Sequence, residues 1–284
     1  MIADLRYKGS SVGKRVFITV CLAAMSLYVL LILYPLLNMV LSSFKTNRAI
    51  LTTPFSLPKA FSLATYKTVW IDKGFSRYFT NSLLVTTISM ALVLLFGSMA
   101  SYGISRYTYK LNTLVYMLFL SGIMLPLKAA IIPLFLLIKT LGLINNPLSV
   151  ILIFLAMALP STVFILAGFM KGIPLELEYA AKIDGCHDFA IYRLVVMPMV
   201  APAIALVTIY TAVPIWNDFF FPLVFLQSDK VTTLPVGLST FFGQHSTNWC
   251  LLFTGLSIAI LPMLVLYLFM SKYFIKGMTA GAVK

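Results

Sequence analysis

The sequence predicts an all-α integral membrane protein with about six transmembrane helices. Of its 284 residues, 61% are hydrophobic and 10% are charged, whereas soluble globular proteins contain roughly 45–50% apolar and about 25% charged residues. The mean hydropathy is +0.99. This composition excludes an ordinary cytosolic enzyme, a disordered chain and a disulfide scaffold, and it indicates that lipid surrounds most of the chain.

Apolar segments of the length that crosses a bilayer, about 20 residues in a helix, predict the spans. The third is the least regular, because Pro126, Lys128 and Pro133 interrupt it, so we expect it to end near Pro126 and a shallow interfacial helix (Ala129–Leu141) to follow. The first is too long for a cleavable signal peptide and predicts an anchor. The six segments are Val16–Leu41, Ser82–Ile104, Leu111–Leu127, Leu148–Met170, Met199–Leu226 and Leu251–Phe274.

The net charge of +13 does not indicate nucleic-acid binding, because no basic helix or aromatic RNA-binding motif accompanies it. Most basic residues lie between the apolar segments, where they can contact lipid headgroups. Their distribution favours a cytoplasmic N-terminus. We therefore expect a cytoplasmic tail (1–15), a first transmembrane helix (16–43), an external loop (44–75), a membrane domain (76–272) that includes a cytoplasmic loop (171–197), and a cytoplasmic C-terminal tail (273–284).

The cytoplasmic loop 171–197 carries signals for a helix over Pro174–Asp184. Pro174 suits the first helical position, where its missing N–H costs nothing. Glu176 and Glu178 place negative charge in the first turn, where the helix dipole favours it. Gly185 can adopt the left-handed conformation that ends a helix.

Two interpretations of this loop follow from its faces. Leu175, Tyr179 and Ile183 form one apolar stripe, and the small residues Ala180 and Ala181 allow close approach of another backbone. A second short helix, Asp188–Val196, is expected to end at Pro198. The loop is either a docking surface for a partner or an interfacial helix packed beneath its own bundle, and the pattern alone leaves both open.

The segment from Glu178 to Gly185, read with Met197-Pro198, resembles the EAA loop of permease subunits in binding-protein-dependent ABC importers. The longer run "IPLELEYAAKIDGC" is similar to the maltose-type carbohydrate branch of that family. Further similar segments follow in order along nearly the whole chain and make the resemblance specific: "SSFKTNRAI", "YFTNSLLVT", "GSMASYGISRY", "IPLFLLIKTLGLINN", "WNDFFFPLVFL" and "KYFIKGMTAGAVK".

The resemblance implies a type I ABC importer permease of the bacterial inner membrane whose EAA loop is a coupling helix, seated in a groove of the ATPase subunit. The implied ATPase contacts are Tyr179, Ala180, Ala181, Asp184 and Gly185, with Glu178 beside them. The family's Glu immediately before the Ala pair is replaced here by Tyr179, which puts a salt bridge at that position in question.

The implied partners are two ATP-binding subunits, a second permease subunit in a heterodimer, and an external or periplasmic solute-binding protein. The implied substrate is a carbohydrate: a sugar, an oligosaccharide or a polyol. The chain lacks a G-x-x-x-x-G-K-[ST] phosphate loop. We therefore expect a non-catalytic subunit that binds no cofactor, with ATP and Mg²⁺ held by the ATPase subunits.

Candidate substrate-path residues lie in the fifth span. An ionisable group in a span is a functional candidate, and Asp218 stands beside Trp216 and Asn217. Pro214 and Pro222 flank this group and can break the fifth helix, which would free backbone carbonyls to line a cavity. An aromatic ring next to a carboxylate and an amide suits a sugar. The alternative is structural: Trp216 lies in the interfacial belt and Asp218 caps a helix. Thr208, Tyr210 and Thr211, about two turns earlier, are further path candidates.

Neither a metal site nor another mode of transport is favoured. Cys21, Cys186, Cys250, His187 and His245 lie apart and have no metal-ligand spacing. The main rival class is a self-sufficient secondary transporter or channel. Such proteins often have related halves with paired broken helices, and the sequence shows no repeat.

Overall fold

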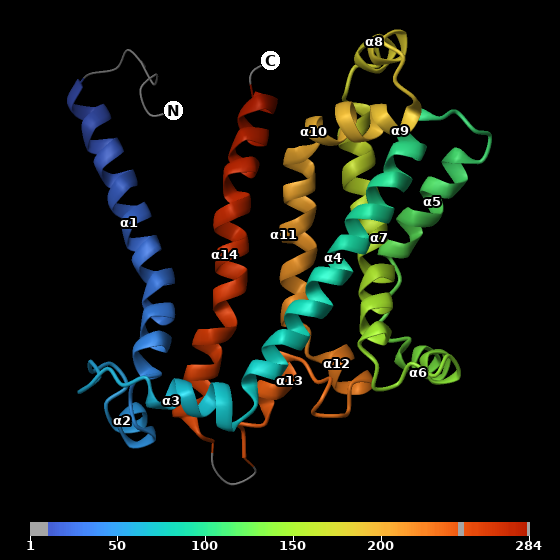
Figure 1. Cartoon of the computed structure of the whole chain (residues 1–284). Coiled ribbons are helices and arrows are strands. Elements are labelled where there is room, and N and C mark those ends of the chain that lie inside the picture. The colour runs from blue at the N-terminus through green and yellow to red at the C-terminus, as the bar shows by residue number, and fades with distance from the viewer. Residues whose placement is uncertain (1–10, 244–246, 283–284) are drawn as a thin grey trace.

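A computed structural model describes residues 11–243 and 247–282, and in this part of the chain the secondary structure consists of helices and one isolated β-bridge between Phe242 and Thr247, with no strand. Long helices run side by side, and short helices lie at both of their ends (Figure 1). The larger part of the predicted N-terminal tail, residues 1–10, lies outside the described residues, as do His245 and residues 283–284.

Within the described residues, four helices are long and apolar enough to cross a membrane, and a fifth span is obtained if one bent pair is counted. The four are α1 (Ser11–Ser42), α4 (Phe75–Arg106), α7 (Pro147–Lys171) and α14 (Trp249–Ala282). The bent pair consists of α11 (Ala201–Asn217), which is the membrane-crossing part, and the segment before it, Asp188–Met199, which meets α11 at 75°. The C-terminal segment predicted as a tail continues α14 as helix to Ala282.

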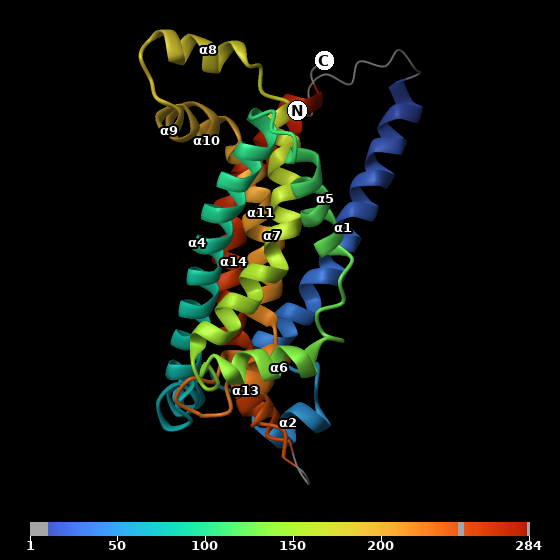
Figure 2. The ribbon, with the colours of Figure 1, turned by 90° about the vertical axis from the view of Figure 1, so that its right-hand side faces the viewer.

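The third predicted span is shorter than expected. Helix α5 (Asn112–Ile123) has 12 residues and is about 18 Å long at 1.5 Å per residue, which is less than the roughly 30 Å of a hydrocarbon core. After Pro126 the chain turns into α6 (Ile131–Thr140), which lies crosswise to the long helices (Figure 2). The predicted shallow helix is therefore present, while the predicted span Leu111–Leu127 is not a full-length helix.

The fifth predicted span, Met199–Leu226, was too long. Helix α11 ends at Asn217, Asp218 is extended with φ −69° and ψ 123°, and α12 (Phe220–Phe225) begins after it. Helix α12 lies at the same end of the molecule as α2 (Asn47–Thr52), α3 (Ala64–Lys67), the π-helical turn η1 (Thr68–Asp72) and α13 (Leu234–Ser239) (Figure 1). The segment predicted as an external loop is thus ordered into short helices.

The pair α4 and α7 forms the centre of the bundle. They pack closely because α4 has no side chain at Gly97: a Cβ there would lie 2.4 Å from Cγ2 of Thr162 on α7. Buried apolar side chains fill the spaces on either side, with Phe221, Phe225 and Ile151 toward α12, and Leu166 and Met170 toward α10 (Met197–Met199). This packing gives α7 and α11 fixed positions relative to α4.

Helix α1 stands apart from this bundle and approaches α14 only near its C-terminal end (Figures 1 and 2). Every side chain from Arg15 to Leu37 is exposed. An apolar helix with this much exposed surface is stable only where lipid or another protein covers it.

Candidate functional site

The loop between α7 and α11 projects beyond the long helices at the end that also carries the first turn of α1 (Figure 1). It contains α8 (Glu176–Ile183), followed by α9 (Asp188–Ile191), the π-helical turn η2 (Tyr192–Val196) and α10, which lie beneath α8 (Figure 2). Helix α8 is shorter than the predicted Pro174–Asp184, because Leu175 is the N-cap residue and Pro174 belongs to the link from α7. The second helix passes through Pro198 and ends at Met199 rather than at Pro198.

Gly185 ends α8 as the sequence predicts, with a positive φ of 84°. Its N–H donates to the Lys182 carbonyl at 3.0 Å, and the Cys186 N–H donates to the Ala181 carbonyl at 3.0 Å. These two bonds form the Schellman motif, which satisfies the last carbonyls of a helix through a left-handed residue. The His187 ring then accepts the Ala190 N–H through Nδ1 at 3.1 Å and starts α9. The direction of α8 relative to α9 is therefore fixed by hydrogen bonds.

The apolar stripe of α8 faces away from the chain. Leu175 is 43% exposed, Tyr179 58% and Ile183 87%. On the inner side, Ala181 packs against the cluster that contains Ile191 and Tyr192. An interfacial helix packed beneath its own bundle would bury the stripe, so the geometry favours the docking interpretation.

Among the six predicted coupling residues, Glu178 alone is buried; Tyr179, Ala180, Asp184 and Gly185 are exposed, and Ala181 is partly buried. The Glu178 carboxylate forms an ion pair with Arg106 of α4, with 2.5 Å between Nε and Oε1. The Tyr102 hydroxyl donates to its other oxygen at 3.3 Å. The structure thus turns Glu178 toward its own chain.

An exposed ion pair joins the end of α8 to the start of α9. Lys182 Nζ lies 3.0 Å from Asp188 Oδ1, and the Tyr107 hydroxyl donates to Asp188 Oδ2 at 3.2 Å. The hydrogen bond with Asp188 raises the pKa of Lys182 above its ordinary value. The hydrogen bonds from Lys182 and Tyr107 lower the pKa of Asp188. Asp188 therefore stays ionised over the whole neutral range.

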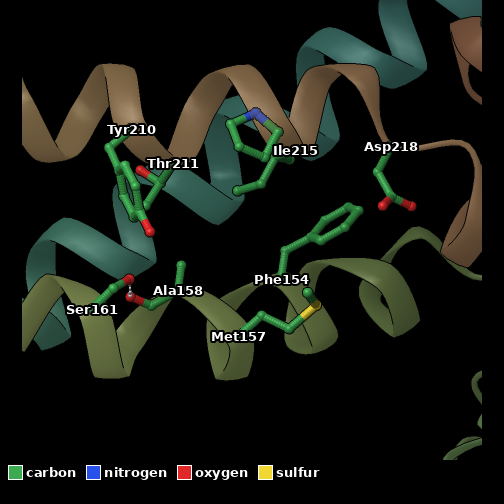
Figure 3. Close-up of a pocket in the computed structure, with 9 residues that line it drawn as sticks. Phe154, Met157, Ala158, Ser161, Tyr210, Thr211, Ile215 and Asp218 are labelled. Atoms are coloured by element: carbon green, nitrogen blue, oxygen red, sulfur yellow. Dashed lines mark hydrogen bonds between the residues drawn. The ribbon is translucent and has the colours of Figure 1, made fainter. Parts of the chain in front are cut away.

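A cavity of about 270 Å³ lies between α7 and α11. In Figure 3, Tyr210 and Thr211 of α11 face Ser161 and Ala158 of α7, and Asp218 closes the end nearest α12. The wall is mostly apolar and carries the polar groups of Ser161, Tyr210, Thr211 and Asp218. Such a mixture can hold the apolar face of a small molecule and bond its hydroxyl groups.

The four predicted path residues divide into two pairs. Thr211 and Asp218 line the cavity, whereas Trp216 and Asn217 do not. Trp216 is 2% exposed and its Nε1 donates to the Ala259 carbonyl of α14 at 3.0 Å, so it is a core residue rather than an interfacial or a path residue. Asn217 bonds the Val213 carbonyl of its own helix at 2.9 Å.

Asp218 has the structural role that the sequence offered as an alternative, and it also borders the cavity. Its Oδ1 accepts the Phe221 N–H at 2.9 Å, which caps the first turn of α12, while its side chain borders the cavity (Figure 3). Sequence reasoning missed the α7 wall. Its signal was the spacing of Phe154, Met157, Ala158 and Ser161, which is i, i+3, i+4 and i+7 and places all four on one helix face.

A second cavity, of about 780 Å³, lies along the same two helices nearer to α8. Gly168 and Gly172 of α7 and Pro202 and Leu206 of α11 contribute to its wall. These residues continue the two helix faces that border the first cavity. On α7 they follow Ser161 at steps of three and four residues, and on α11 they precede Tyr210 at steps of four. We call this face of α7 and α11 the α7–α11 groove.

Its membrane-crossing helices make the chain a multi-pass membrane protein, and the α7–α11 groove is the kind of concave, partly polar surface that can receive a small molecule. The chain belongs to the family described as "Binding-protein-dependent transport system inner membrane component", whose pattern matches residues 2–280.

Relatives and a solved structure agree with this assignment. The chain is 37% identical to the melibiose/raffinose/stachyose import permease protein MelC of Bacillus subtilis over 228 residues, which cover 80% of this chain and 83% of MelC. It is 33% identical to the arabinooligosaccharides transport system permease protein AraQ of Halalkalibacterium halodurans over 255 residues, 88% and 91% of the two chains. A chain of a bacterial ABC transporter that imports the acidic polysaccharide alginate shares the fold, with a TM-score of 0.80 and 22% identity over 94% of this chain and all of the other.

Proposed function

We propose that this chain is a permease subunit of an ATP-driven importer that moves a carbohydrate across the bacterial inner membrane, and that separate ATPase subunits drive it through the loop 171–197. The family supports the transport role. The carbohydrate class is supported by the names of two relatives, MelC and AraQ. ATP and Mg²⁺ bind to the ATPase subunits in this proposal, and the chain itself catalyses no reaction.

The observation that carries the proposed coupling is the exposed stripe of α8. Three large side chains, Leu175, Tyr179 and Ile183, stand in water on a helix whose end is fixed by the Gly185 cap. Covering one such side chain contributes about 1.5–3 kcal/mol, so a groove in an ATPase subunit gains from receiving this face. The exposed Ala180 beside the stripe lets the partner's backbone come close.

The proposed orientation and partners follow from the two ends of the molecule. The first turn of α1 lies at the same end as α8 (Figure 1), so an ATPase bound to α8 requires a cytoplasmic N-terminus. The opposite end, with α2, α12 and α13, then faces the external solute-binding protein. A second, different permease chain supplies a partner for the exposed apolar surface of α1 and the missing wall of the α7–α11 groove.

In this proposal the α7–α11 groove is one side of the translocation path. Its hydroxyl groups, from Ser161 and Tyr210, bond sugar hydroxyls, and the apolar wall contacts the sugar's C–H faces. The chain's work is conformational: closure of the ATPase dimer moves α8, and the movement opens the groove to one side of the membrane and then to the other.

Purification of the chain with its ATPase subunits, followed by reconstitution with the binding protein, tests the proposal. We expect ATP hydrolysis to rise when a matching sugar and its binding protein are added, across a screen of sugars. Ile183→Asp, at an 87% exposed position, should remove the ATPase from the purified complex while leaving the chain in the membrane. Ile183→Leu, which keeps the apolar surface, should retain it. Retention of the ATPase by the Asp variant contradicts docking at α8.

A further inference from the structure

The ion pair between Arg106 and Glu178 joins two parts of the chain, α4 and α8, that the proposed transport cycle must move together. Arg106 is the last residue of α4, a full membrane-crossing helix, and Glu178 lies in the first turn of α8. Their side chains are 6% and 8% exposed. The pair therefore lies beneath the surface where α8 meets the bundle.

Such a buried pair requires that each charge keep its partners, because an unpaired buried charge is strongly destabilising. The Arg106 guanidinium also donates from Nη2 to the Ile173 carbonyl at 3.3 Å, in the link between α7 and α8. The Tyr102 hydroxyl, one turn earlier on α4, donates to Glu178. Arg106 thus holds the end of α7 and the start of α8 with one planar group, whose donor geometry Lys cannot reproduce.

A second attachment to the same helix end lies on the other side of the loop. Tyr107, the residue that follows α4, donates to Asp188, which in turn pairs with Lys182 of α8. The loop 171–197 is therefore tied to the end of α4 at Arg106 and Tyr107, and the Tyr192 hydroxyl also hydrogen-bonds Ser98 Oγ of α4 at 2.7 Å. Through Gly97, α4 is packed directly on α7.

We propose that Glu178 is a positioning residue that transmits movement of α8 to α4 through Arg106, and that it is not an ATPase contact. This inference rests on the proposed function of α8. The docking surface then consists of the stripe Leu175, Tyr179 and Ile183, and the acidic residue nearest the Ala pair serves the chain's own interior. A push on the stripe reaches α4 because the ion pair resists separation.

The test compares Glu178→Gln, Arg106→Gln and the double variant in the purified transporter with its ATPase subunits. Each single variant should keep the ATPase bound, since the stripe is intact, and should lose at least about fivefold of the sugar-stimulated ATP hydrolysis, the lower end of typical coupling factors. The double variant leaves no unpaired buried charge. Its sugar-stimulated ATP hydrolysis should be no lower than that of the less active single variant, because the two residues act as one unit.

Two controls keep the test decisive. Lys110→Gln removes one positive charge at an exposed position just after α4 and should leave sugar-stimulated hydrolysis unchanged. Arg106→Lys keeps the positive charge but loses the planar set of guanidinium donors. Its sugar-stimulated ATP hydrolysis should lie between that of Arg106→Gln and that of the parent chain. If a single variant is lost from the membrane, the double variant still reports on coupling.

Two results overturn the inference while leaving docking at α8 intact. One is loss of the ATPase from Glu178→Gln with full retention by Arg106→Gln, which makes Glu178 a direct contact. The other is a double variant whose fold loss of sugar-stimulated ATP hydrolysis equals the product of the losses in the two single variants, which would show that the two residues act independently. Failure of the parent chain to purify with any ATPase refutes the proposed function instead.

Discussion

Substitution of Gly185 tests whether the α8 cap sets the geometry of the coupling loop. The residue has φ +84° and a Cβ built on it meets nothing within 4 Å, so a side chain at this position costs conformational strain and no clash. That strain is about 1–2 kcal/mol for an ordinary L residue. Asn tolerates the left-handed region better than Ala. Pro adds two further losses, because its φ is fixed near −65° and it lacks the N–H that bonds the Lys182 carbonyl.

Sugar uptake should therefore be highest in the parent and should decrease in the order Gly185→Asn, Gly185→Ala and Gly185→Pro. The Pro variant should lose the Schellman bonds, at about 1 kcal/mol each, in addition to the strain, and should fail to couple ATP hydrolysis to uptake. Uptake in vesicles, normalised to the amount of permease in the membrane, measures the series. Full uptake by the Pro variant refutes the view that a fixed α8 cap is needed.

Three further predictions concern the bundle and the cavity. Gly97→Leu should push α4 away from Thr162 of α7 and lower the free energy of unfolding by about 1–3 kcal/mol. The measurement is the thermal midpoint of unfolding in detergent, which should fall. An unchanged midpoint would show that α4 and α7 can move apart without loss of stability. Trp216→Phe should cost about 1 kcal/mol through the lost bond to the Ala259 carbonyl without altering which sugars are taken up, whereas altered selectivity would return Trp216 to the path. Asp218→Asn keeps an acceptor for the Phe221 N–H, so the amount of permease in the membrane should match that of the parent. Asp218→Ala removes the acceptor, which should cost about 1 kcal/mol of stability and lower the amount of permease in the membrane. Equal amounts of both variants would contradict the capping role.

The sequence predicted the parts of the fold that local chemistry decides. Gly185 was identified as a left-handed cap because glycine alone adopts that conformation without strain, and the stripe Leu175, Tyr179 and Ile183 followed from the helix period. The break near Pro126 followed from the proline itself. In each case the residues that determine the feature are near one another in the chain.

What the sequence did not predict depends on contacts between distant segments. The ion pair of Glu178 with Arg106 crosses 72 positions (178 − 106), and no local pattern distinguishes an acidic residue that turns inward from one that faces a partner. Trp216 is buried because Ala259 of α14 supplies an acceptor, a contact that depends on tertiary packing. The helix break that the sequence allows between Pro214 and Pro222 is present at Asp218, but the predicted span ran on to Leu226 because apolar residues follow Asp218.

Photo-crosslinking from α8 in the intact transporter tests the central claim most directly. A photoreactive amino acid placed at Ile183, which is 87% exposed, should form a covalent product with the ATPase subunit in the native membrane, and the same group at Leu57 at the opposite end should not. A product of Ile183 with the external binding protein, or labelling of this position by a reagent that cannot cross the membrane, would contradict the account.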